Sequence, residues 1–164
     1  IRLRVKGLAR EGQPFFYMSD WSLSIHTFNW IRKNLKQGTI LELGSGAGSQ
    51  RLSKHYTVYS VEHDEKWLNK YNTNYIYAPL VDGWYDPSFL DDLPQYDLLI
   101  IDGPPGVIGR EGILKHLDKF QTDIPIILDD TNREAEKALA VQISKYLNRK
   151  GETLNAGAKS FTVF

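Results

Sequence analysis

Short apolar runs recur along the chain, and most of them end at glycine or at an acidic residue. Five runs are rich in β-branched and aromatic residues and predict strands, at residues 39–43, 56–62, 75–79, 96–102 and 124–129. Their apolar residues are continuous rather than alternating, which is typical of strands buried on both faces of a parallel sheet. We therefore expect a sheet that is covered by helices on both sides.

Segments with a helical spacing of apolar positions alternate with these strands. The predicted helices lie at about residues 22–35, 48–55, 65–72, 87–92, 109–120 and 132–148, and strands at 152–156 and 159–164 close the chain as a hairpin. This order predicts an α/β fold with a doubly wound, mostly parallel sheet of seven strands and an antiparallel last strand. No linker interrupts it, so we expect a single domain over residues 1–164, with an N-terminal arm and cap helix (1–38) before a core (39–164).

Three glycines at alternate positions follow the first predicted strand, in the stretch Glu42-Leu43-Gly44-Ser45-Gly46-Ala47-Gly48. Glycine tolerates positive φ and lets a ligand approach the backbone, and the helix that follows presents unpaired N–H groups. The next strand ends at Glu62, 18 residues after Gly44. An acidic residue at about this offset accepts hydrogen bonds from ribose hydroxyls. Together these features predict a nucleotide-type ligand; a tight turn without a ligand is the alternative.

The spacing Glu-x-Gly-x-Gly-x-Gly resembles motif I of the class I S-adenosylmethionine-dependent methyltransferases, whereas dinucleotide-binding enzymes carry G-x-G-x-x-G. The resemblance runs through most of the chain and implies the Rossmann-like methyltransferase fold, with residues 39–164 as a cofactor-binding core. It also implies that the glycine turn contacts the amino acid moiety and ribose of S-adenosylmethionine. The cofactor-binding residues that it implies are Glu42, Gly44, Ser45, Gly46, Gly48, Glu62, His63, Asp82, Gly83 and Asp102.

The fourth and fifth predicted strands also end in carboxylates, at Asp102 and at the pair Asp129-Asp130. In the family resemblance Asp102 begins motif IV, beside the departing methyl group, and it is our candidate catalytic residue. Catechol-type O-methyltransferases hold Mg²⁺ with an Asp after strand 4 and an Asp-Asn pair after strand 5. The resemblance therefore implies a metal site at Asp102, Asp129 and Asp130, whose oxygens suit Mg²⁺, Mn²⁺ or Ca²⁺.

Two departures from that pattern leave the metal site open. Asp130 stands where the catechol-type enzymes carry Asn, and Pro105 stands where they carry a lysine base. Asp130 is equally suited to cap the helix that begins near residue 132, and Arg133 to pair with Asp129. The stretch from Asp102 to Pro105 also matches the Asp-Pro-Pro-Tyr motif of amino-methylating enzymes poorly, because a glycine intervenes and the aromatic residue is missing.

Aromatic residues and histidines flank the expected site. Trp84 and Tyr85, between the third and fourth strands, either stack on adenine or substrate or pack as a lid on the sheet edge. The aromatic segment 14–21 either covers the cofactor or acceptor or packs in the core. His26 and His63 are candidate general bases, because neutral imidazole is available near pH 7; structural roles are the alternative.

Composition narrows the choice of partners. The 164 residues carry 20 basic and 20 acidic side chains, so the net charge is zero, and we do not expect a nucleic-acid partner, which calls for a basic excess. The chain has no cysteine, which excludes disulfides, Cys-ligated zinc and a thiol nucleophile. No apolar stretch approaches the roughly 18 residues that span a membrane, so we expect no membrane partner and a cytoplasmic location.

The function expected from these patterns is transfer of a methyl group from S-adenosylmethionine to oxygen or nitrogen of a small-molecule or glycan acceptor, with Mg²⁺ as a second candidate cofactor. One alternative is a non-catalytic module of the same fold that binds the cofactor or a partner chain. Another is an NAD-dependent short-chain-type oxidoreductase, which uses a Tyr-x-x-x-Lys pair. Tyr71 and Tyr75 are not followed by Lys at that spacing, and Tyr146 is followed by Lys150 only at the end of a helix.

Overall fold

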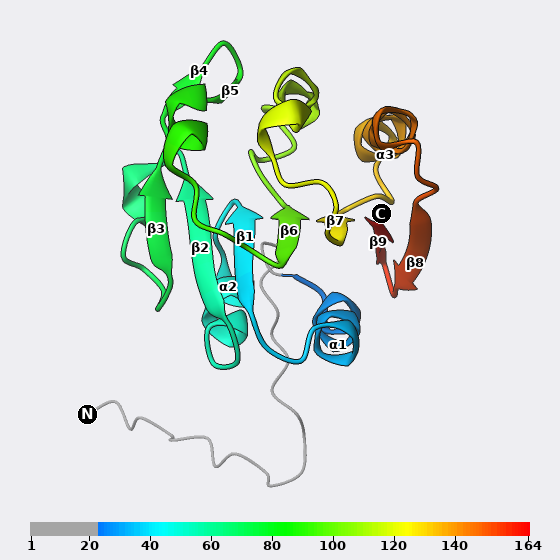
Figure 1. Cartoon of the computed structure of the whole chain (residues 1–164), viewed down its shortest axis with the longest axis horizontal. Helices are drawn as coiled ribbons and strands as arrows, with labels where there is room; N and C mark the ends of the chain where they lie inside the picture. Colours follow the sequence, from blue (N-terminus) through cyan, green and yellow to red (C-terminus); the bar gives the residue numbers. More distant parts are fainter. Residues whose placement is uncertain (1–22) are drawn as a thin grey trace, which may run out of the picture.

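Seven strands form one sheet in the computed structural model, which describes residues 23–164 (Figure 1). They are β1 (Thr39–Leu43), β2 (Thr57–Glu62), β3 (Asn74–Tyr77), β6 (Leu98–Ile101), β7 (Ile126–Leu128), β8 (Glu152–Ala156) and β9 (Lys159–Val163). Their order is β3-β2-β1-β6-β7-β9-β8. Neighbours from β3 to β7 pair in parallel, whereas β9 pairs antiparallel with both β7 and β8. The predicted mostly parallel sheet with an antiparallel last strand is confirmed.

Helices cover both faces of this sheet, as predicted for a doubly wound fold. The α-helices are α1 (Ile25–Asn34), α2 (Ala47–Leu52) and α3 (Glu134–Leu147). Because side chains alternate along a strand, Ile40 packs in the layer under α1 and α2, and its neighbour Leu41 packs in the layer under α3. β6 divides in the same way between the two layers. Two buried layers explain why the strands read as continuous apolar runs.

Helix ends follow the local sequence. α1 begins after Ser24, whose hydroxyl accepts a hydrogen bond from the Thr27 N–H at 3.0 Å. α3 ends at Asn148, which takes the left-handed conformation that closes many helices. The predicted helices at about 22–35 and 132–148 are thus confirmed, except that residue 22 lies outside the described residues. The aromatic segment 14–21 also lies outside them.

Two predicted helices are wrong. Residues 65–72 form only a short 3-10 helix, η1 (Glu65–Trp67), because Asn69 turns into a positive φ of 59°. Residues 109–120 form two, η3 (Glu111–Lys115) and η4 (Leu117–Lys119). Gly112 there packs against Trp84 so closely that a Cβ would collide with that side chain, so packing rather than helical propensity sets this backbone. The predicted short helix 87–92 is present as the 3-10 helix η2 (Pro87–Asp92).

A small two-stranded ribbon was not predicted. Its strands are β4 (Leu80–Val81) and β5 (Trp84–Tyr85), joined by a tight turn with positive φ at Asp82 and Gly83. Both aromatic residues of the ribbon, Trp84 and Tyr85, are buried in the core layer under α3. Within the described part of the chain, no helix is both long enough and apolar enough to cross a membrane.

Candidate active site at the carboxyl edge of the sheet

A cleft of about 630 Å³ opens at the carboxyl ends of the central strands. Gly44 and Ser45 line it after β1, Glu62 and His63 at the end of β2, and Asp102 after β6. In open α/β sheets ligands bind at this edge, and clefts of roughly 300–1,000 Å³ suit molecules of cofactor size. The structure therefore brings together five of the residues that the sequence marked for a cofactor.

Gly44 is the point where the ends of β1 and β6 meet. Its φ is +91°, and a Cβ there would lie 3.1 Å from the Asp102 carbonyl oxygen and from Gly103. Both the conformation and the contact favour glycine. The turn thus brings the backbone at Asp102 against the glycine segment, on one wall of the cleft.

Glu62 joins the glycine turn to β2. Its Oε1 accepts hydrogen bonds from the Ser45 N–H at 2.7 Å and from the Ser45 hydroxyl at 2.9 Å. Its Oε2 accepts one from the His63 N–H at 3.1 Å, and His63 Nδ1 lies 3.6 Å from the same oxygen. Glu62 is buried, with 4% of the residue exposed, yet it lines the cleft. These contacts fix its carboxylate in one orientation.

Glu42 lies beneath the turn rather than in the cleft. Ser60 donates its hydroxyl to Glu42 Oε1 at 2.5 Å, and the carboxyl is almost fully buried. Burial raises the pKa of Glu42 to about 7, although the Ser49 and Ser60 hydroxyls oppose the shift. Among the described residues, Glu42 contacts the hydroxyls of Ser60 and of Ser49, and Ser49 in turn accepts a hydrogen bond from the Gly46 N–H of the glycine turn.

Four more of the predicted cofactor-binding residues do not line the cleft in the described part of the chain. Gly46 precedes α2 and donates its N–H to the Ser49 hydroxyl. Gly48 packs against Leu23, where a Cβ would lie 3.2 Å from that side chain. Asp82 and Gly83 form the turn of the β4–β5 ribbon and are exposed. A cofactor role for these four stays a prediction.

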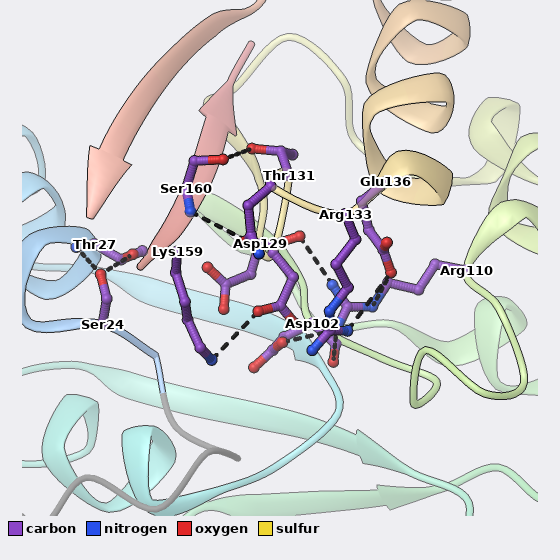
Figure 2. Close-up of polar contacts among 12 residues, drawn as sticks. Ser24, Thr27, Asp102, Arg110, Asp129, Thr131, Arg133, Glu136, Lys159 and Ser160 are labelled. Carbon is purple, nitrogen blue, oxygen red and sulfur yellow. Dashed lines mark hydrogen bonds and ion pairs between the residues drawn. The ribbon is translucent and has the colours of Figure 1, made fainter. Parts of the chain in front are cut away.

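Arg110 is the residue that sequence reasoning missed. It is buried, and its Nη2 donates to Asp102 Oδ1 at 3.1 Å and to Asp130 Oδ2 at 3.0 Å (Figure 2). The guanidinium also donates to the carbonyl oxygens of Asp102, Pro104 and Asp129. A single arginine in the predicted helix 109–120 gave no signal of this role, because the contacts depend on the fold of that segment.

The two carboxyl groups that follow β7, Asp129 and Asp130, have different surroundings. Both oxygens of Asp129 lack a hydrogen-bond partner among the described residues, and the residue is 1% exposed. Burial, with Asp102 and Asp130 nearby, raises the pKa of Asp129. Burial also acts to raise the pKa of Asp130, but the cations Arg110, Lys159 and Arg133 outweigh it and hold that pKa below its usual value. The pKa values of these two neighbouring carboxyls are therefore shifted in opposite directions.

Asp102, Asp129 and Asp130 fit a divalent cation in part. One oxygen from each of the three lies within 4.8 Å of the others, and the unpartnered Asp129 oxygens are suitable donors. However, Arg110 engages Asp102 and Asp130, and Lys159 Nζ lies 3.3 Å from Asp130 Oδ1. Figure 2 shows Asp102, Arg110 and Lys159 converging from different elements. A cation here would share the aspartates with three side-chain cations, Arg110, Arg133 and Lys159.

Contacts decide two of the sequence alternatives for Asp130 and Arg133. Arg133 pairs with Asp130 at 3.1 Å, and no side chain in residues 23–164 caps α3, so the alternatives of an Arg133–Asp129 pair and an Asp130 cap are wrong. Trp84 is buried and stacks on His116, with ring centroids 5.0 Å apart. Tyr85 is buried in the same layer but reaches the cleft wall. Trp67, which the sequence did not single out, also lines the cleft.

The arrangement is similar to solved structures of methyltransferases. Precorrin-6y C5,15-methyltransferase from Geobacter metallireducens has 15% sequence identity and a TM-score of 0.60, over 85% of this chain and 84% of that one. Ribosomal protein L11 methylase from Lactobacillus delbrueckii subsp. bulgaricus has 14% identity and a TM-score of 0.57, over 84% and 74%. This chain has the class I methyltransferase fold. The resemblance stated from motif I is therefore confirmed at the level of the fold.

A third structure contains ligands. The MycE methyltransferase from the mycinamycin biosynthetic pathway, in complex with Mg, SAH and mycinamycin VI, has 16% identity and a TM-score of 0.50, over 84% of this chain and 45% of that one. No protein-family model matches the sequence, and no curated protein sequence matches it. At such identities the likeness concerns the fold, and activity has to be argued from the site.

Proposed function

We propose that this protein is an S-adenosylmethionine-dependent methyltransferase. One observation carries the proposal: the Glu62 carboxylate is fixed by Ser45 and His63 at the border of a cleft of about 630 Å³. A buried carboxylate at the tip of the second strand is placed to accept hydrogen bonds from ribose hydroxyls. The fold adds support, because it is the fold of enzymes that use this cofactor.

The cofactor would lie along the glycine turn. Gly44 and Ser45 would face its amino acid part and ribose, Glu62 would accept from the ribose hydroxyls, and Trp67 offers an aromatic surface nearby. When bound, S-adenosylmethionine supplies a methyl group activated by its sulfonium charge. The protein's own task is then mainly to hold the acceptor beside that group, and positioning can supply up to about 7–11 kcal/mol of the barrier.

Asp102 is the proposed catalytic residue. It lines the cleft, its side chain is 23% exposed, and Arg110 holds its Oδ1. Burial raises the pKa of Asp102, although Arg110 opposes the shift. A carboxylate with a raised pKa is a better proton acceptor than an ordinary aspartate. Asp102 would orient a hydroxyl or amine of the acceptor and take its proton.

We propose a small-molecule or glycan acceptor. The net charge of zero supports this over a nucleic acid. Val107, at 96% exposure on the cleft border, offers an apolar contact outside the cofactor region. The L11 methylase and the precorrin methyltransferase differ in the molecules that their names give, so the fold does not select the acceptor.

A divalent cation at Asp102, Asp129 and Asp130 is the second part of the proposal. It is supported by the donor set and by the two unpartnered oxygens of Asp129, which are almost fully buried. Mg²⁺ there would supply positive charge next to the acceptor oxygen and lower the pKa of its hydroxyl. Asp129 and Asp130 would hold it, with Asp102 at the cleft side.

The proposal is tested by calorimetric titration with S-adenosylmethionine and S-adenosylhomocysteine, followed by assays for transfer of a labelled methyl group to panels of small molecules and glycans. We expect micromolar binding of both ligands and transfer that is lost in Asp102→Asn. Absence of binding would refute the methyltransferase function. Binding without transfer to any acceptor would favour the non-catalytic, cofactor-binding module.

A further inference from the structure

Tyr85 is a buried tyrosine that lines the cleft. The residue is 1% exposed, and its ring packs against Trp84 and Phe89 with centroids 5.6 Å and 6.1 Å away. Tyr85 nevertheless lines the cleft, and its buried hydroxyl has no hydrogen-bond partner among the described residues. The ring therefore belongs to the core, while the hydroxyl is left without a partner beside Gly103, another residue of the cleft wall.

An unpaired buried hydroxyl is unusual and costs stability. Other tyrosines of the chain show the ordinary arrangement. Tyr56 donates its hydroxyl to the Leu35 carbonyl at 2.8 Å, and the hydroxyl of Tyr96 accepts from the Gln121 N–H at 2.7 Å. A phenylalanine at residue 85 would fill the same space without that cost. The hydroxyl therefore calls for a partner that is not part of the described chain.

The position of this hydroxyl is set by the glycines of the two strand ends. A Cβ on Gly103 would collide with the Tyr85 oxygen, and it would also lie 2.9 Å from Gly44 Cα. The hydroxyl thus lies where the β6 end approaches the glycine turn. On the other side, the Tyr85 ring is 6.2 Å from the ring of His63, next to Glu62.

The surrounding charges decide what kind of partner this is. Burial raises the pKa of Tyr85 well above its usual value, and the carboxylates of Glu62 and Asp102 add to the shift. The phenol therefore keeps its proton and acts as a donor. A carboxylate or phosphate partner would be repelled by the same two residues. The hydroxyl is therefore suited to an uncharged oxygen or nitrogen.

We propose that the Tyr85 hydroxyl donates a hydrogen bond to an uncharged oxygen or nitrogen in the nucleoside part of S-adenosylmethionine. This rests on the proposed function. The amino acid part of the cofactor offers only an ammonium, which cannot accept a hydrogen bond, and a carboxylate, which Glu62 and Asp102 disfavour. Ribose oxygens and adenine nitrogens are the uncharged acceptors that remain.

The test is Tyr85→Phe, titrated with S-adenosylmethionine, S-adenosylhomocysteine and methylthioadenosine, which lacks the amino acid part. We expect all three affinities to fall by a similar factor of about 5–10, the usual effect of one hydrogen bond. We also expect the Tm of the unliganded variant to equal or exceed that of the wild type, because an unpaired hydroxyl has been removed. A merely structural tyrosine would not weaken binding while preserving stability.

Tyr96→Phe is the matched control, because it removes a hydroxyl that is already paired within the protein. It should lower the Tm and leave the three affinities unchanged. If the wild type binds the ligands and Tyr85→Phe binds methylthioadenosine equally tightly, or loses stability, the role of Tyr85 is refuted and the methyltransferase function stands. If the wild type binds none of the three, both proposals fail.

Discussion

Ser45 donates two hydrogen bonds to one oxygen of Glu62, from its N–H at 2.7 Å and from its hydroxyl at 2.9 Å. The two residues are 17 positions apart and come from the ends of neighbouring parallel strands. The glycine turn and the acidic strand end, which the sequence marked separately, are thus one unit. The orientation of the Glu62 carboxylate is set before any ligand arrives.

Glu62→Gln should weaken the binding of S-adenosylmethionine and S-adenosylhomocysteine at least tenfold. The amide keeps the shape of the carboxylate, but it loses the charge that strengthens hydrogen bonds from ribose hydroxyls, and it turns an NH₂ group toward the donors that now surround it. Calorimetric titration measures the effect. Glu65→Gln, an exposed substitution three residues further on, is the control and should bind like the wild type. Equal affinities for both variants would show that Glu62 only supports the turn.

Arg110→Met should lower the free energy of unfolding by about 3–5 kcal/mol. The substitution removes the buried cation that Asp102 and Asp130 share at 3.1 and 3.0 Å, whereas Arg133 and Lys159 remain next to Asp130. Removing one partner of a buried ion pair has a cost of this size. Urea unfolding measures the loss. Arg133→Met also removes a partner of Asp130, but Arg133 is 44% exposed, so it should cost below about 1 kcal/mol. Similar losses in the two variants would contradict a structural role specific to Arg110.

The strands and the central site could be predicted because they depend on local pattern. Continuous apolar runs mark strands buried on both faces, and the chain direction then sends Glu62 and Asp102 to the same edge of the sheet. The segment at 109–120 could not be predicted in this way. Its backbone depends on the close contact between Gly112 and Trp84, which lies in a ribbon almost 30 residues earlier in the chain. A contact between such distant residues produces no periodic pattern of apolar positions in the sequence.

Arg110 was missed for the same reason. Sequence reasoning finds acidic residues at strand ends, because their positions follow from the strands themselves. The cation that compensates them comes from an irregular segment, eight positions after Asp102, and it reaches Asp130 only through the fold. Tyr85 was singled out as an aromatic surface, whereas the structure draws attention to its hydroxyl.

Mg²⁺ should raise the Tm of the wild type if the three aspartates hold a cation. A ligand that binds only the folded state raises the free energy of unfolding, and at concentrations above its Kd this increase grows with the logarithm of the ligand concentration. Asp129→Asn should lose this response, since Asp129 supplies the two oxygens that no described residue engages. Thermal unfolding at increasing Mg²⁺, with Asp123→Asn as an exposed control, measures it. A Tm that is independent of Mg²⁺ would mean that Arg110, Lys159 and Arg133 are the cations that balance this cluster.

Glu42 should make the stability of the unliganded protein depend on pH. Burial raises the pKa of Glu42 from 4.5 to about 7, so between these values the folded state holds a proton that the unfolded state has released. The stability that the protonated carboxyl contributes is complete below pH 4.5 and is lost as pH rises through 7, at about 1.4 kcal/mol per pH unit.

Glu42→Gln removes this titration while it keeps a group that can accept the Ser60 hydrogen bond. The difference in free energy of unfolding, variant minus wild type, should therefore increase between pH 5 and 7 and level off above pH 8. Urea unfolding of both proteins across this range measures it, and taking the difference cancels the other titrating groups that the two proteins share. A difference that stays constant with pH would mean that Glu42 is ionised in the folded state, held by Ser60 and Ser49 strongly enough to offset its burial.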